Sequence, residues 1–248
     1  MGGSTVVVGW QLLVALVVLV VLAAAAAGFG RIGTSRSTVV AAVRATVQLA
    51  VVAGIIVALV RSWWGTVAFV LVMLGVATWT SGRRMSPDRS GLLAGVAIVA
   101  GTVPVLGVVL ATGTVPLTGI AVVPIAGIVI GGAMSATSLA GRRALDQLTA
   151  RRGEYEAALA LGLLDRDAAL LVVRGAAGDA LVPPLDQTRT VGLVTLPGAF
   201  VGVLLGSGDP VQAGAAQLLV LVGLLAAETI AVLVAVELVA RGRIRRPA

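Results

Sequence analysis

Apolar residues fill long runs along nearly the whole chain, and short polar connections separate one run from the next. About 20 helical residues cross a hydrocarbon core of roughly 30 Å, so runs of this length can cross a membrane as helices. The pattern predicts an all-α polytopic membrane protein with about seven transmembrane helices in a single domain, residues 1–248. The predicted spans are residues 6–29, 39–60, 63–80, 91–111, 117–139, 190–205 and 213–239.

The first run, residues 6–29, lies where a secretory signal peptide would lie. However, no basic leader precedes it, it is longer than a cleaved signal core, and no convincing cleavage site follows it. We therefore expect it to be a retained helix.

Arginine divides the connections into two classes. The connections after the first, third and fifth runs and the chain end after the seventh are rich in arginine, whereas the others carry only Arg61 or no basic residue. Because arginine-rich loops stay in the cytoplasm, the amino terminus is predicted outside and the carboxyl terminus inside. Abundant Ala, Val, Gly and Arg without lysine is typical of a GC-rich bacterial genome, so we expect a multi-pass plasma-membrane protein.

One long polar segment, residues 140–189, holds most of the acidic residues. Its apolar residues recur at helical spacing between Leu145 and Leu159, which predicts a helix. Gly162 can end that helix, Asp165 is placed to cap a second one, and a Pro-Pro pair closes the segment. We therefore expect a cytoplasmic helical hairpin between the fifth and sixth spans.

Composition narrows the chemistry. The mean hydropathy is +1.08 and only 12% of residues are charged, as in a membrane protein. The net charge of +7 comes from arginines that lie at the ends of apolar runs. Because they do not form a basic surface patch, we expect no nucleic-acid partner. Without His or Cys the usual metal sites cannot form, and no metal ligand set is identifiable. Without lysine no phosphate-binding loop is present, so we expect no enzyme and no cofactor on this chain.

The sequence EAALALG, residues 156–162, is the strongest local signal. It matches the E-A-A-x-x-x-G core of the cytoplasmic coupling loop in ABC transporter permeases. Ala157 and Ala158 would let a helix enter a groove closely, Gly162 permits a sharp turn, and Glu156 can pair with a basic residue of a partner. Alanine-rich helices that end in glycine are also common without any role in coupling. The position of this segment on the only large polar loop favours coupling to an ATPase. Asp165, in the same loop, is a further candidate coupling residue.

Small residues and prolines mark the fifth and sixth spans. Glycine and serine at 127, 131 and 135, and glycines at 198, 202 and 206, form ladders that allow close helix approach, in ordinary bundle packing or at a dimer seam. A proline in each span opens the helix, which at membrane depth is usual beside a cavity. We therefore place a translocation route there. Its candidate residues are Pro124, Gly131, Met134, Ser135, Pro197, Gly198, Gly202 and Glu228.

Few polar side chains lie within the spans, and such residues are functional candidates by default. Arg44, Gln48 and Gln217 belong to this group. Arg44 lies near a cytoplasmic end and can extend to the interface, and Glu237 can pair with an arginine four residues later. Glu228 lies near the middle of the last span, where an ionised carboxylate is costly, and a transport or gating role and a structural one both stay open.

Four passages resemble the family of iron-export ABC permeases (FetB-like), whose plant relatives are associated with aluminium tolerance. They are VRATVQLAVVAGII, VVPIAGIVIGGAMSATSLA, EAALALG and TRTVGLVTLPGAFVGVLLGSGDPVQA. Gly132 stands where that family often has asparagine, and Ala216 where it often has tyrosine. The resemblance implies a permease subunit that pairs with a separate ATP-binding subunit, forms a homodimer in the lipid bilayer, and exports iron or another metal or small solute. An ATP-independent carrier or channel and a non-transporting scaffold are the alternatives.

Overall fold

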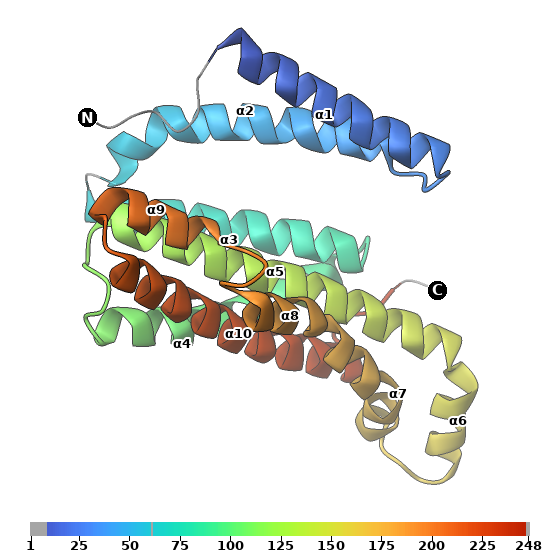
Figure 1. The fold of residues 1–248 in the computed structure, drawn as a ribbon. Coiled ribbons are helices and arrows are strands. Elements are labelled where there is room, and N and C mark those ends of the chain that lie inside the picture. The colour runs from blue at the N-terminus through green and yellow to red at the C-terminus, as the bar shows by residue number, and fades with distance from the viewer. Residues whose placement is uncertain (1–8, 61, 247–248) are drawn as a thin grey trace. The chain divides into compact units, whose positions relative to one another are not determined.

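The computed structural model describes residues 9–60 and 62–246, which form helices joined by short turns (Figure 1). The elements are α1 (Trp10–Phe29), α2 (Ser35–Val60), α3 (Trp63–Met85), the 3-10 helix η1 (Arg89–Leu93), α4 (Ala94–Ala111), α5 (Gly119–Ala150), α6 (Arg152–Ala160), α7 (Asp165–Ala180), α8 (Val182–Thr190), α9 (Gly198–Ser207) and α10 (Pro210–Ala240). Six of the helical segments, α1, α2, α3, η1 with α4, α5 and α10, are long and apolar enough to cross a membrane. The predicted all-α, polytopic class is confirmed.

The predicted sixth span, residues 190–205, is not one helix. Helix α8 ends at Thr190, an irregular turn follows, and α9 has only 10 residues, or about 15 Å of helix. Gly192 adopts a φ of +82° and Pro197 an extended conformation, and both interrupt the helix. The composition is apolar on both sides of this break, so hydropathy alone did not reveal it.

The chain divides into two compact units, residues 1–59 and 60–248. Helix α1 and most of α2 form the first unit, in which Ala27 is the one buried side chain among the described residues. The predicted first span began at residue 6, but residues 1–8 lie outside the described part, where helix α1 begins at Trp10. Arg44 and Gln48 are exposed on α2.

Helices α3, α4, α5 and α10 form the core of the second unit and approach each other closely at glycines. A Cβ on Gly82 of α3 would lie 2.8 Å from the carbonyl oxygen of Gly91 in η1, and a Cβ on Gly101 of α4 would meet the carbonyl oxygen of Ala227 in α10. Lipid supplies no hydrophobic drive between helices, so close backbone packing of this kind holds a membrane bundle together. Ile98, Ile130, Ala133 and Ala231 are among the apolar residues buried at its centre.

The predicted hairpin is present, although its first part is a continuation of the fifth span. Helix α5 runs past the predicted end at residue 139 as far as Ala150, and a break at Arg151 separates it from α6. Gly162, with a φ of +91°, makes the turn between α6 and α7 as predicted. Residues of α5, α7 and α10, including Val173 and Val236, share one buried apolar cluster.

Two details of the hairpin differ from the prediction. Leu164, not Asp165, occupies the N-cap of α7, because the turn after Gly162 is completed one residue earlier; Asp165 lies in the first helical turn, where its charge complements the helix dipole. Pro183 and Pro184 do not close the hairpin but lie in the first turn of α8, where a missing N–H costs no intrahelical hydrogen bond.

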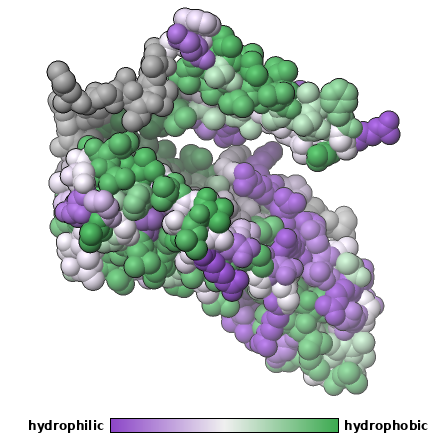
Figure 2. Space-filling view, in the orientation of Figure 1, coloured by the Kyte–Doolittle hydropathy of each residue, from purple (hydrophilic) through white to green (hydrophobic). Residues whose placement is uncertain are grey.

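Arginine-rich segments meet at one end of the second unit. Ser86, directly after α3, donates through Oγ to the carbonyl oxygen of Arg245 at 2.8 Å, and Arg246 Nη1 lies 2.6 Å from Asp146 Oδ1 in the extension of α5. Hydrophilic residues gather over the α7 and α8 end in Figure 2, whereas apolar ones cover the region of α9. The second unit is therefore polar at one end, in agreement with the distribution of arginine along the sequence.

Candidate functional site

Helix α6 presents one face of the EAALALG segment outward. Glu156 and Ala157 are exposed, whereas Ala158 is buried where α6 packs against the rest of the hairpin. Arg152 donates through Nε to Glu156 Oε1 at 2.7 Å, and Arg151 pairs with Glu154 and thereby lowers the pKa of Glu154 below its ordinary value. The pair of Arg152 with Glu156 is exposed and contributes little to stability. The predicted pairing of Glu156 with a basic residue of a partner protein stays a prediction.

The tip of the hairpin, residues 161–164, is apolar and exposed. Leu161 is 83% exposed and Leu164 is 73% exposed, and a Cβ on Gly162 would meet no atom within 4 Å. Asp165 follows the tip and accepts a hydrogen bond from the Tyr155 hydroxyl at 3.5 Å. Exposed leucines at the end of a polar hairpin are typical of a protein contact surface.

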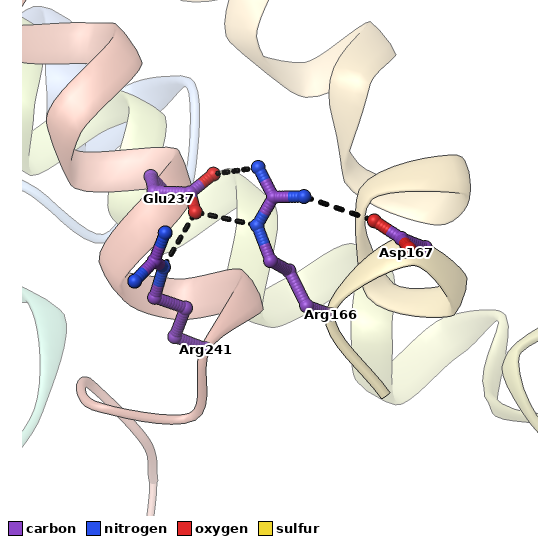
Figure 3. A network of polar contacts seen from close by, with 4 residues as sticks. All are labelled: Arg166, Asp167, Glu237 and Arg241. Atoms are coloured by element: carbon purple, nitrogen blue, oxygen red, sulfur yellow. Dashed lines mark hydrogen bonds and ion pairs between the residues drawn. The ribbon is translucent and has the colours of Figure 1, made fainter. Parts of the chain in front are cut away.

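A network of charges joins the first turn of α7, directly after the hairpin tip, to the last transmembrane helix (Figure 3). Arg166 of α7 donates through Nε to Glu237 Oε1 at 2.6 Å and through Nη2 to Oε2 at 3.0 Å. Arg241 Nε donates to the same Oε1 at 2.6 Å, so the predicted ion pair between Glu237 and Arg241 is confirmed. Arg166 also reaches Asp167 at 2.9 Å.

Sequence reasoning missed Arg166 as the second partner of Glu237. The two residues are 71 positions apart, and only the fold of the hairpin brings them together. The hydrogen bonds that Arg166 donates to Glu237 raise the pKa of the Arg166 guanidinium. Because this contact is bidentate, it fixes the orientation of the two side chains as well as their distance, and it holds α7 and the end of α10 in one relative orientation.

The candidate route residues of α5 lie on one face. Pro124 and Ser135 are exposed and Gly131 is half-buried, at positions that recur at helical spacing, while the opposite face packs into the core. Met134 lies on the side of that core, against its central apolar cluster. The structure thus groups three of these four α5 residues on one uncovered face.

Helix α9 is almost uncovered. It packs against α10, none of its residues is buried, and a Cβ on Gly198, Gly202 or Gly206 would meet no atom within 4 Å. The glycine ladder therefore makes no close helix contact within the described part of the chain. Pro197 is the N-cap residue and offers no side-chain acceptor.

Gln217 of α10 supplies that acceptor. Its side chain is buried, and its Oε1 accepts a hydrogen bond from the Phe200 N–H at 3.1 Å. The first N–H groups of any helix lack partners within the helix, and in lipid an unsatisfied group is costly. The intramembrane glutamine thus has a structural task that the sequence did not reveal.

Glu228 belongs to the buried face of α10. It is 6% exposed, and its Oε1 would lie 2.5 Å from a Cβ on Gly132 of α5. Its Oε2 and the buried hydroxyls of Thr102 and Thr137 have no hydrogen-bond partner among the described residues. The candidate route residues therefore do not form one cluster: Glu228 is enclosed, while Pro124, Ser135 and the α9 glycines are open.

No group of three or more His, Cys, Asp or Glu residues that could hold a metal ion occurs in the part of the chain that the structure describes. Glu156 instead pairs with one arginine and Glu237 with two, whereas Glu228 is buried apart from other acidic residues. The described residues thus supply no ready-made chelating set.

Comparison with known proteins places these features in a family of membrane proteins. The chain is 32% identical over 205 residues to the UPF0014 membrane protein STAR2 of Oryza sativa subsp. japonica, covering 81% of this chain and 71% of the relative. It is 33% identical over 171 residues to the protein ALUMINUM SENSITIVE 3 of Arabidopsis thaliana, covering 68% and 62%.

A bacterial relative is the probable iron export permease protein FetB of Escherichia coli (strain K12), 28% identical over 177 residues, which cover 71% of this chain and 68% of the relative. The predicted resemblance to FetB-like proteins and their plant relatives is confirmed. No solved structure matches the chain. The model of the Uncharacterised protein family (UPF0014) matches residues 10–244, and the chain belongs to that family.

Proposed function

We propose that this chain is the membrane-spanning permease subunit of an ABC transporter and that a separate subunit binds and hydrolyses ATP. One observation carries the proposal: an exposed apolar hairpin tip is joined to a transmembrane helix by the contact of Arg166 with Glu237. The chain itself contains no lysine for a phosphate-binding loop, so ATP would be bound and hydrolysed by the partner subunit rather than by this chain.

The hairpin tip is the part that contacts the ATP-binding subunit. Leu161 and Leu164 enter an apolar groove of that subunit, and exposed Glu156 and Ala157 lie on the adjacent face. A movement of the tip reaches the membrane by two routes, through α6 into α5 and through Arg166 into α10. This arrangement requires the hairpin and the carboxyl terminus in the cytoplasm and the amino terminus outside, in a plasma membrane.

Two copies of the chain form the translocation unit. The uncovered face of α5, with Pro124, Gly131 and Ser135, and the open glycines of α9 are the surfaces that another copy would complete. The route runs along these surfaces, and Glu228 acts from the enclosed side as a gating residue. Unchanged transport by an expressed Glu228→Gln protein would remove that residue from the route.

The cargo is iron or another metal or small solute, moved outward. The similarity to the E. coli relative, a probable iron export permease, supports this cargo and direction. Because the described residues hold no cluster of metal-ligating side chains, a metal would pass as a chelate rather than as a bare ion held by carboxylates and imidazoles.

The test compares two exposed positions of the same polar segment. Leu161→Glu with Leu164→Glu should abolish co-purification with a phosphate-loop ATPase and the ATP-dependent transport, since charges cannot enter an apolar groove unpaired. Val182→Glu, at a position 50% exposed on α8, is the matched control and should retain both. Transport by the isolated chain without ATP would instead establish a carrier or channel, and no transport in either setting would leave a scaffold.

A further inference from the structure

The chain after α10 folds back as a tail that is fixed by the backbone of Arg245 and by the side chain of Arg246, which contacts Asp146. Gly242 adopts a φ of +63° and turns the chain, and the carbonyl oxygen of Arg245 lies within hydrogen-bond distance of two hydroxyls, Ser86 Oγ at 2.8 Å and Ser90 Oγ at 3.2 Å. The N–H of Arg245 donates to Ser90 Oγ at 3.3 Å. Because only the backbone of Arg245 makes these bonds, the position of the tail does not depend on its side chain.

An open cleft of about 680 Å³ lies between this tail and the turn that joins α3 to η1. Its lining residues are Asp88, Arg89, Ser90, Leu93, Gly242, Arg243 and Arg245. Three guanidinium groups and one carboxylate give the lining a formal charge of +3 − 1 = +2. The cleft is therefore suited to an anion.

The one carboxylate in the cleft is already satisfied by its neighbours. Asp88 Oδ1 accepts hydrogen bonds from Ser90 Oγ at 2.6 Å and from the Ser90 N–H at 3.1 Å. Ser86 Oγ lies 2.7 Å from Asp88 Oδ1 and shares its one proton between this oxygen and the carbonyl oxygen of Arg245. These bonds from Ser90 and then Ser86 hold the pKa of Asp88 below its ordinary value of 3.8. Within residues 9–60 and 62–246, no carboxylate forms an ion pair with Arg89, Arg243 or Arg245.

The neighbouring residues are typical of the level of lipid headgroups. Trp79, on the last turns of α3, is 57% exposed, and the Arg83 guanidinium lies 5.4 Å from the centre of its ring. Tryptophan and arginine concentrate where the membrane meets water. Leu92, beside the cleft in η1, is 44% exposed and offers an apolar surface. Guanidinium groups therefore lie beside an apolar surface at the membrane boundary.

We propose that this cleft binds the phosphate of an anionic phospholipid, with Arg89, Arg243 and Arg245 as donors and Leu92 against the acyl chains. Arginine matches phosphate geometry with two parallel N–H groups, and basic pockets at membrane ends bind anionic headgroups. The bound lipid attaches the tail and the α3–η1 turn to the membrane surface. This site is independent of the ATP-driven function proposed above.

The experiment uses the full chain, delipidated and reconstituted with phosphatidylglycerol or with phosphatidylcholine, and counts bound lipid by native mass spectrometry. Arg243→Gln with Arg245→Gln should bind phosphatidylglycerol roughly 30-fold more weakly and phosphatidylcholine unchanged. Arg174→Gln with Arg189→Gln removes the same charge from exposed sites of the hairpin segment and should have little effect. Melting temperatures of both variants check the fold.

A second arm offers inorganic phosphate to the protein in phosphatidylcholine and measures binding by calorimetry. Weak or absent binding there, together with the loss of phosphatidylglycerol in the cleft variant, supports the lipid as ligand. Tight binding of inorganic phosphate with phosphatidylglycerol binding unaffected by the variant would overturn the lipid assignment in favour of free phosphate. Equal lipid binding by wild type, cleft variant and control, without phosphate binding, would overturn the site altogether.

Discussion

Replacing Gly101 by alanine should loosen the packing of α4 against α10. The ideal position of the new Cβ meets the carbonyl oxygen of Ala227, and it lies 3.2 Å from the Ala227 carbonyl carbon and 3.1 Å from the Ala231 Cβ. The obstacle is backbone, which cannot rotate away as a side chain would. The two helices must therefore separate locally.

The magnitude follows from two opposing terms. Inserting a methyl group into a packed core costs about 1–3 kcal/mol, and exchanging glycine for alanine within a helix returns up to about 1 kcal/mol. Because the obstacle is backbone, the cost lies at the upper end of its range, about 3 kcal/mol. The expected net loss is then about 2 kcal/mol, which for a chain of this size lowers the melting temperature by roughly 4–8 °C.

The assay is thermal unfolding of the purified protein in detergent. Gly107→Ala is the matched control, because it lies on the same helix and its Cβ would meet nothing within 4 Å. We expect that control to melt at the wild-type temperature or slightly above it. If both variants melt alike, α4 and α10 do not cross at Gly101 as described, and the reasoning from close backbone packing is refuted.

Three further outcomes are expected. Glu237→Gln removes the charge that two guanidinium groups share, so the melting temperature should fall by about 2–4 °C and trypsin should cleave the hairpin faster; an unchanged digestion rate would contradict the network. Gln217→Leu leaves the Phe200 N–H without its acceptor, and exchange of that amide should speed up by about fivefold, whereas Gln217→Glu keeps the acceptor and the slow exchange. The pKa of Asp88 in the folded protein is below 3.8, so its contribution to stability is complete above pH 3.8 and is lost as the pH falls through the lower folded pKa. In Asp88→Asn, this part of the dependence of the melting temperature on acid pH should disappear.

Hydropathy and arginine placement predicted much of the fold. Apolar length depends on composition, so the long helices and the polar hairpin could be read from the sequence, and the turn at Gly162 followed from the residue that tolerates a positive φ. The break in the helix after Thr190 could not be predicted from hydropathy, because the non-helical residues there are as apolar as the helical ones around them. The continuation of α5 to Ala150 was not predicted either, because the composition becomes polar after residue 139 while the helix continues.

The sequence analysis did not predict the contacts between residues that are far apart in the chain. The pair of Glu237 with Arg241 is local and follows from helical spacing, whereas Arg166 reaches Glu237 only after the hairpin has folded. Likewise Gln217 and Glu228 were visible as polar residues in apolar helices, but their surroundings were not: one caps a neighbouring helix, and the other faces a glycine.

The uninterrupted course of α5 has a mechanical consequence. Its 32 residues form a rod about 48 Å long, which begins near one membrane surface and ends in the polar hairpin segment. A tilt of about 10° around its midpoint displaces the two ends by roughly 8 Å relative to each other, in opposite directions. A small push at Ala150 is therefore converted into a comparable sideways shift at Gly119, without any bending within the helix.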